Sequence, residues 1–282
     1  MSAPVHGLKP PLTTRQRLLR SPQFLLGLTI TVVIVVLALI GPWIAPFGER
    51  EITGPPFSGA TGVFGTDHLG QDVLSRLLHG GQSVLVVAFL GTLLGMIGGV
   101  ALGVIAAYAG GWWDEVLMRL NDIALAFPQI LLALVVLTAL EPTLWLLVVL
   151  IGISHMPRIA RVSRGVALGL VGREFVQSAE ALGERPSRIV VAEVLPNMTT
   201  PLLAEAGLRL TYSIGLVAAL GFLGFAADPG AADWGQMINE NGLALTTQPW
   251  AILAPVLTIG TFTVGTNLMA DSIAKLTGRV LT

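Results

Sequence analysis

The sequence contains no cysteine in its 282 residues, and only 12% of them are charged. Without cysteine the chain can form no disulfide, no thiolate nucleophile and no cysteine-type zinc site. Soluble domains carry about 25% charged residues, whereas this chain combines its few charges with 53% hydrophobic residues. A single soluble core could not bury that much apolar surface, so the composition predicts an integral membrane protein.

Signals for nucleotide binding, metal binding and catalysis are also missing. The phosphate-binding loop Gly-x-x-x-x-Gly-Lys-Ser/Thr does not occur, so we do not expect the chain to bind ATP by that route. The dispersed histidines and the lack of a nucleophile beside a base predict neither a metal site nor intrinsic catalysis; the histidines are His6, His68, His79 and His155. A net charge of -1, without a basic stripe interleaved with aromatic residues, argues against a nucleic-acid partner.

Six apolar runs are long enough to cross a bilayer as helices, which takes about 20 residues. We expect them at residues 24–44, 84–108, 123–140, 143–159, 208–225 and 250–269. Pro128 is expected to kink the third run. The first run exceeds the roughly 7–15 apolar residues of a cleaved signal peptide, so we interpret it as an uncleaved anchor. The predicted fold class is an all-α membrane protein with six transmembrane helices.

Arginine and lysine accumulate on the cytoplasmic side of membrane proteins, which predicts the orientation. With the N-terminus inside, the inner segments hold Lys9, Arg15, Arg17, Arg20, Arg119, Arg158, Arg161, Arg164, Arg173, Arg185, Arg188, Lys275 and Arg279. The outer loops, at about 47–82 and 227–249, hold only Arg50 and Arg76. Both termini are therefore expected in the cytoplasm.

The second run carries four glycines spaced four residues apart: Gly91, Gly95, Gly99 and Gly103. On a helix they share one face, where another helix backbone can approach closely. We interpret this face as a helix-packing surface, with a pore-lining role as the alternative.

Two charged pairs allow more than one interpretation. Glu205 and Arg209, spaced i, i+4 at the inner end of the fifth run, are interpreted as a structural ion pair in preference to a substrate or proton site. Asp122 either contacts Arg119 or stabilises the first turn of a helix.

The polar segment between the fourth and fifth runs predicts a compact helix–turn–helix. Residues 174–182 can form a short helix with Phe175, Ala179 and Leu182 along one side. Gly183 can end it in a left-handed cap, and 185–187 can open a second helix that Pro196 interrupts before the fifth run. Such a shape suits docking into a groove on another protein.

This segment resembles the EAA loop of ATP-binding-cassette importer permeases, which is Glu-Ala-Ala, three residues, Gly, and a downstream hydrophobic-x-Leu-Pro. Gln177, Ser178 and Ala179 occupy the first three positions, Gly183 the glycine, and Leu195-Pro196 the end. Gln177, Ser178 and Glu193 depart from the usual residue types. The resemblance implies contact with an ATPase subunit by Phe175, Gln177, Ser178, Ala179, Glu180, Ala181, Leu182, Gly183 and Arg185.

A second match, at residues 64–76, resembles a signature of C-type permeases in the dipeptide/oligopeptide/nickel branch. Further matches are Arg119-x-x-Asp122 leading to Ala126-Phe127-Pro128, the run 160–164, and Asp233-Trp234-Gly235. Within the signature we single out Asp67, Gly70, Asp72, Ser75 and Arg76. They either form the external mouth of the permease or start a helix, with Asp67 capping the turn before Leu69 and Asp72 pairing with Arg76.

The resemblance implies a domain organisation of 1–22 as a cytoplasmic segment, 23–82 as the first transmembrane helix and external loop, and 83–282 as the permease domain with its coupling loop at 174–200. It implies half of a translocation pore for peptides or related small solutes in a bacterial inner membrane. Expected partners are a second permease, one or two ATPase subunits that hold ATP and Mg, an extracytoplasmic solute-binding protein and membrane lipid. An ion-gradient-driven transporter and a non-transporting scaffold are the alternatives; the former predicts paired ionisable groups at the bilayer midplane and internal repeats.

Overall fold

The computed structural model describes residues 18–228 and 230–278, and its regular elements are helices. In chain order they are α2 (Pro22–Ile44), α3 (Val73–His79), α4 (Gly81–Ala109), α5 (Gly111–Ala126), α6 (Gln129–Ala139), α7 (Leu144–Val171), α8 (Glu174–Ala181), α9 (Pro186–Ile189), the π-helix η1 (Val190–Val194), α10 (Leu195–Phe222), α11 (Trp234–Glu240), the 3-10 helix η2 (Gly242–Ala244) and α12 (Trp250–Gly278). Extended pairing in the described residues amounts to two isolated bridges before and at the start of α3. The predicted all-α class is confirmed. Predictions for His6, Lys9, Arg15, Arg17, Arg279 and most of segment 1–22 fall outside the described residues.

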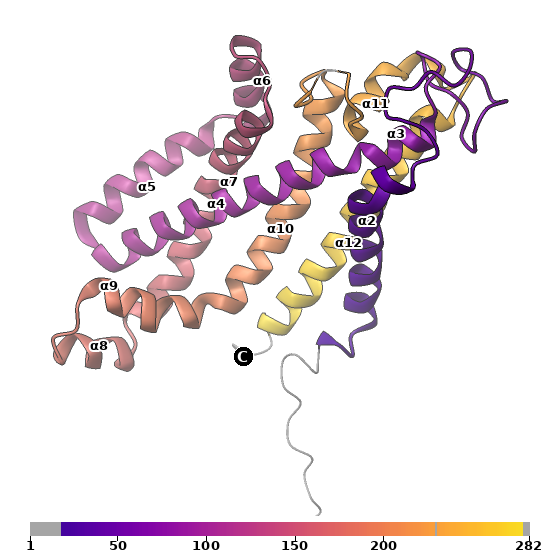
Figure 1. Ribbon diagram of the computed structural model, residues 1–282. Coiled ribbons are helices and arrows are strands. Elements are labelled where there is room, and N and C mark those ends of the chain that lie inside the picture. Colours follow the sequence, from indigo (N-terminus) through magenta and orange to yellow (C-terminus); the bar gives the residue numbers. More distant parts are fainter. Residues whose placement is uncertain (1–17, 229, 279–282) are drawn as a thin grey trace, which may run out of the picture.

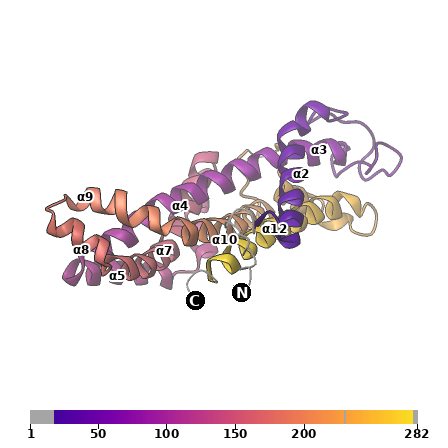
Figure 2. The ribbon, with the colours of Figure 1, turned by 90° about the horizontal axis from the view of Figure 1, so that it is seen from below.

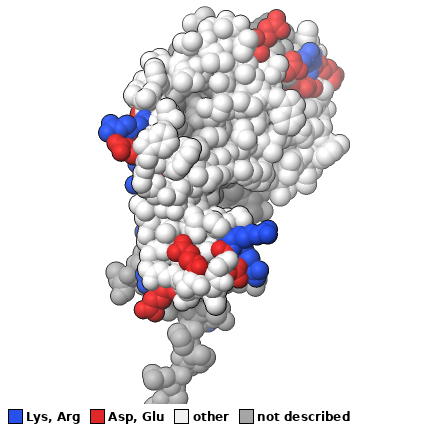
Figure 3. Space-filling view, turned by 90° about the vertical axis from the view of Figure 1, so that its left-hand side faces the viewer, with Lys and Arg blue, Asp and Glu red and all other residues white. Residues whose placement is uncertain are grey.

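Among the described residues, five stretches are long and apolar enough to cross a membrane, and the bent pair α5–α6, counted as one span, makes a sixth. The short elements gather at two opposite ends of these spans, with α8 and α9 at one end and α3 and α11 at the other (Figures 1 and 2). On the face seen in Figure 3, charged groups gather at the top and the bottom and at one place on the left edge, and most of the surface between them is uncharged. This arrangement is the one expected of a chain whose middle lies in hydrocarbon.

The third span is broken rather than kinked. α5 and α6 meet at an angle of 77°, and Phe127 and Pro128 between them are both extended. A proline disfavours the helical conformation of the residue before it, which explains the position of the break. α5 also begins at Gly111, well before the expected start at residue 123.

The fourth span is longer than predicted, because α7 continues from the expected end at residue 159 to Val171. Arg161 and Arg164 are therefore helical and do not belong to a loop. The sequence analysis placed both arginines in the polar segment that follows the fourth run. In the structure both side chains pair with acidic residues on α5, which allows the helix to continue.

The expected interruption at Pro196 does not occur, since helix runs from α9 through η1 into α10. The backbone N–H of Leu195 bonds to the carbonyl of Val190, five residues back, as in a π-helix. This change of register starts α10 next to Pro196, at a helical position where a missing N–H is tolerated.

The glycine face of α4 packs against α7, as predicted. A β-carbon added to Gly91 would lie 2.7 Å from Cγ2 of Ile151, and one added to Gly99 would lie 2.6 Å from Cβ of Ile159. No side chain could fit between the two helices at these points, so they form a close pair without a lipid or pore surface between them.

Candidate functional site

The α8–α9 segment has the predicted helix–turn–helix form. Gly183 has a φ of +77°, its N–H bonds to the carbonyl of Glu180 at 2.9 Å, and the N–H of Glu184 bonds to that of Ala179 at 3.1 Å. These two bonds are those of a Schellman motif, which ends a helix and reverses the chain. The left-handed cap predicted at Gly183 is confirmed.

We expect replacement of Gly183 by alanine to destabilise the reversal by about 1 kcal/mol, because a residue with a β-carbon rarely adopts positive φ. A β-carbon there would touch nothing within 4 Å, so the cost is conformational rather than steric. Gly183→Asn, which tolerates this conformation better, serves as the matched control. Hydrogen exchange of the α8 amides should rise in the alanine variant and rise less in the asparagine variant; equal exchange would contradict the strain argument.

α8 is fixed to the rest of the chain by Val176, whose side chain is fully buried. Val176 belongs to a small apolar cluster with Val104, Ala107, Ala167, Ile189, Val194 and Met198, which come from α4, α7, α9, η1 and α10. The hydroxyl of Tyr108, in the last turn of α4, also donates to Glu180 at 3.0 Å. These contacts attach α8 to three long helices, α4, α7 and α10.

The predicted coupling residues, unlike Val176, are mostly exposed. All nine except Ala179 are exposed, and Leu182 has 83% of its surface accessible. Phe175, Ala179 and Leu182 line one hollow together with residues of α9 and η1. The three residues therefore lie along one side of α8, as predicted. The sequence reasoning missed Val176 as the anchor, although its spacing of three from Ala179 is a helical signal.

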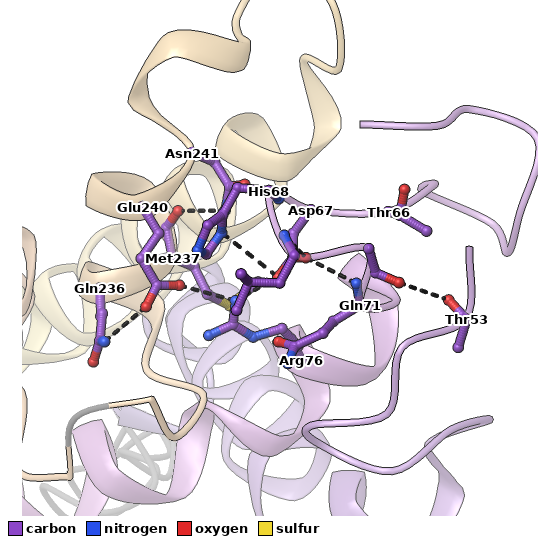
Figure 4. A network of polar contacts seen from close by, with 12 residues as sticks. Thr53, Thr66, Asp67, His68, Gln71, Arg76, Gln236, Met237, Glu240 and Asn241 are labelled. Carbon is purple, nitrogen blue, oxygen red and sulfur yellow. Dashed lines mark hydrogen bonds and ion pairs between the residues drawn. The ribbon is translucent and has the colours of Figure 1, made fainter. Parts of the chain in front are cut away.

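Most of the external signature residues lie in a buried polar network (Figure 4). Asp67 accepts from the backbone N–H of Leu69 at 2.9 Å, which confirms the predicted cap, and from that of Gln71 at 2.8 Å. Arg76 donates to Asp67 at 2.5 Å and to Glu240 of α11 at 2.9 Å. The network thus joins the loop before α3 to the segment around α11.

The predicted Asp72–Arg76 ion pair is wrong. Asp72 caps α3 by accepting from the N–H and the hydroxyl of Ser75, at 2.8 and 2.7 Å. With Asp72 committed to the cap, Arg76 turns to Asp67 and Glu240. The side chains of Asp67, Ser75 and Arg76 are at most 2% exposed, so they hold the loop before α3 to the α11 segment and present no surface of their own.

Gly70 in the same signature has a φ of +83°, and a β-carbon there would collide with the carbonyl of Gly54. The carbonyl of Gly70 in turn accepts from the N–H of Thr53 at 2.8 Å. Only glycine at position 70 allows the backbone around it to approach the backbone of residues 53–54 this closely.

Asp233 starts α11 in a similar way. Its carboxylate accepts from the N–H groups of Gly235 and Gln236 at 2.9 and 3.2 Å, and from the hydroxyl of Ser83 at 3.1 Å. Burial raises the pKa of Asp233 above its ordinary value. The matched Asp-Trp-Gly motif is therefore a helix cap that also ties α11 to the first turn of α4.

Inside the spans, a second polar group joins three helices. The hydroxyl of Ser213 on α10 lies 2.9 Å from Nε2 of His155 on α7 and 2.7 Å from the hydroxyl of Thr92 on α4. The predicted Glu205–Arg209 ion pair is present at 2.6 Å and is buried. Because α10 begins at Leu195, this pair lies within the helix and not at its end.

Within residues 18–228 and 230–278, no group of three or more metal-ligating side chains comes together. The structure therefore contains three arrangements: an exposed helix–turn–helix with a buried anchor, a polar network that joins the loop before α3 to α11, and polar contacts that join the long helices. These arrangements can hold a partner protein and transmit motion.

Comparison with known proteins gives a consistent family. The family described as "binding-protein-dependent transport system inner membrane component" matches residues 99–279, and the N-terminal transmembrane domain of oligopeptide transport permease C matches residues 13–56. The dipeptide transport system permease protein DppC of Alkalihalophilus pseudofirmus is 32% identical over 92% of this chain and 86% of its own.

Two other relatives and one solved structure agree. The di/tripeptide transport system permease protein DppC of Pseudomonas aeruginosa is 33% identical over 88% of this chain and 84% of its own. The glutathione transport system permease protein GsiD of Escherichia coli is 31% identical over 86% and 81%. An inward-facing structure of the MetNI methionine ABC transporter has a TM-score of 0.55 and 19% identity, covering 70% of this chain and 96% of the other, which indicates a shared fold.

Proposed function

The chain belongs to the family of binding-protein-dependent transport system inner membrane components, and we propose that its α8–α9 segment is the site at which a separate ATPase contacts it and drives import. It is a permease subunit of an ATP-binding-cassette importer and a multi-pass protein of the bacterial inner membrane. Permease subunits of this kind are non-catalytic, so we assign ATP and Mg to the ATPase subunits. Neither the ion-gradient transporter nor the scaffold gains support from the relatives.

In this proposal α8, α9 and both termini face the cytoplasm, while the network around Arg76 lies outside, where a solute-binding protein delivers its cargo. The basic residues between α7 and α10 support this orientation. A second permease completes the pore. The relatives named for dipeptides, di/tripeptides and glutathione support short peptides as the solute.

The observation that carries the proposal is the pairing of an exposed surface with a buried anchor on one short helix. Leu182 is open to a partner, while Val176, two turns earlier, is enclosed by residues of α4, α7 and α10. A force that displaces α8 from its exposed side therefore also displaces the long helices packed against Val176, since packed apolar cores deform little.

We expect Leu182→Asp to weaken ATPase binding by about tenfold or more, because a leucine buried in an interface contributes about 1.5–3 kcal/mol and a carboxylate cannot replace it. The measurements are copurification of the ATPase subunits from membranes and peptide-stimulated ATP hydrolysis. Leu243→Asp is the matched control, because Leu243 is 97% exposed at the opposite end of the molecule. Unchanged copurification in Leu182→Asp, or an equal loss in both variants, would contradict the docking assignment.

A further inference from the structure

α5 is held to the rest of the chain with few buried apolar contacts. Asn121 is the one residue of α5 that is buried, while Leu120 and Ile123 are 60% and 59% exposed. A largely apolar hollow of about 340 Å³ separates α5 and the start of α6 from α4 and α7. Tight packing therefore does not fix the position of α5, whereas α6, the other half of the arm formed by α5 and α6, buries Ala133 and Leu137 in the main apolar core.

A line of polar contacts with α7 fixes α5 instead. Arg164 makes a two-pronged bond to Asp114, with both N···O distances at 2.5 Å, and Arg161 bonds to Asp122 at 2.6 Å. The Asn121 side chain donates to the carbonyl of Pro157 at 3.0 Å. We call these contacts the α5–α7 seam.

The seam continues past the break at Pro128. Arg158 donates to the side-chain oxygen of Gln129 at 2.6 Å, and the amide of Gln129 donates to the carbonyl of Ser154. Successive turns of α7 thus meet successive turns of α5 and then the first turn of α6, in antiparallel order. The contacts hold both halves of the broken span.

The seam also unites two sequence motifs that the proposed function leaves unexplained. Asp122 belongs to the Arg119-x-x-Asp122 match, and Arg161 and Arg164 belong to the run 160–164. At its end α7 reaches Val171, and α8 starts at Glu174 only three residues later. Arg161 and Arg164 therefore lie within about the last three turns of the helix that leads into α8.

We propose that the α5–α7 seam makes the α5–α6 arm move together with α7 when the ATPase displaces α8, and that Arg164 and Asp114 are its principal positioning residues. This inference rests on the proposed function. Arg164 holds both carboxylate oxygens of Asp114, the geometry that best resists rotation of one helix against the other. The seam transmits the motion to α5, which has little apolar packing of its own to hold it against α7.

The test is a charge reversal in the complete importer. Arg164→Asp and Asp114→Arg should each lower peptide uptake about tenfold or more, and the double reversal should restore it to within about threefold, as for a direct pairwise interaction. The ATPase subunits should copurify with all three variants and hydrolyse ATP, so the ratio of peptide imported to ATP hydrolysed falls in the single variants alone. Uptake that stays at the unaltered level in the single variants, or a double reversal without rescue, would overturn the inference.

A distance measurement covers variants that assemble poorly. Because the chain has no cysteine of its own, spin labels can be placed on cysteines substituted for Leu120 of α5 and Leu168 of α7, both exposed. The label distance should stay constant between the nucleotide-free and ATP-bound importer, and should change with nucleotide when Arg164→Ala is added. A distance that changes equally with and without Arg164→Ala would overturn the inference. Failure of the ATPase to bind the unaltered chain would instead refute the proposed function.

Discussion

Replacing Gly99 with leucine should lower the free energy of unfolding by more than about 3 kcal/mol, beyond the usual 1–3 kcal/mol cost of an overpacked core. Even a β-carbon at Gly99 would lie 2.6 Å from Cβ of Ile159 and 2.8 Å from the carbonyl oxygen of Met156. Because the second of these neighbours is backbone, α7 itself would have to move. The α4–α7 pair supports both the α5–α7 seam and the apolar cluster around Val176, so import should be lost together with stability.

Gly215→Leu is the matched control for this prediction. Gly215 lies inside α10, is exposed, and a β-carbon there would meet nothing within 4 Å. Leucine is also a better helix former than glycine by roughly 0.8–1 kcal/mol. The measurement is the temperature at which the detergent-solubilised chain loses its monodisperse peak. Equal losses in both variants would show that the glycine spacing does not mark a packing face.

The sequence predicted this face because its signal is local. Four glycines at a spacing of four must share one side of a helix, whatever the rest of the chain does. The sequence could not predict which helix packs against this face, since the contact with Ile151 and Ile159 depends on how α7 is placed. Likewise Pro128 predicted a kink in the third run, whereas the full break and its angle of 77° could not be predicted from the local sequence.

The coupling segment was predictable for the same reason, since Gly183 and the apolar spacing around Ala179 are short-range features. Its errors arose where distant residues decide the outcome. Pro196 is a strong local sign of interruption, but the π-helix before it absorbs the missing hydrogen bond. The arginines of α7 looked like the end of a span because their acidic partners lie on another helix.

The signature at residues 64–76 shows most clearly where prediction from local sequence fails. Asp72 and Arg76 have the spacing of a helical ion pair, and sequence reasoning could not weigh that pair against a glutamate 164 residues away. Glu240 was not singled out, because nothing near it in the sequence indicates a buried partner. Long-range polar pairing is set by the packing of α11 against the loop before α3.

Asp67→Asn should lower the free energy of unfolding of the region around α3 and α11 by about 3 kcal/mol, the lower part of the range for breaking a buried ion pair. The asparagine oxygen can still accept from the N–H groups of Leu69 and Gln71, so the turn is retained. Its amide nitrogen would face Arg76, which would keep Glu240 as its one carboxylate partner. The loss therefore reports the ion pair rather than the cap.

Asp228→Asn provides the comparison, because the Arg50–Asp228 pair joins the same two external segments at 3.3 Å with side chains 59% and 67% exposed. Exposed pairs contribute about 0–1 kcal/mol, since water solvates both charges nearly as well when they separate. Protease protection of the loop before α3, measured against denaturant in detergent, should fall strongly in Asp67→Asn and hardly in Asp228→Asn. Similar protection in the two variants would mean that burial of Asp67 does not make its ion pair stabilising, and that the external loops are held by other contacts.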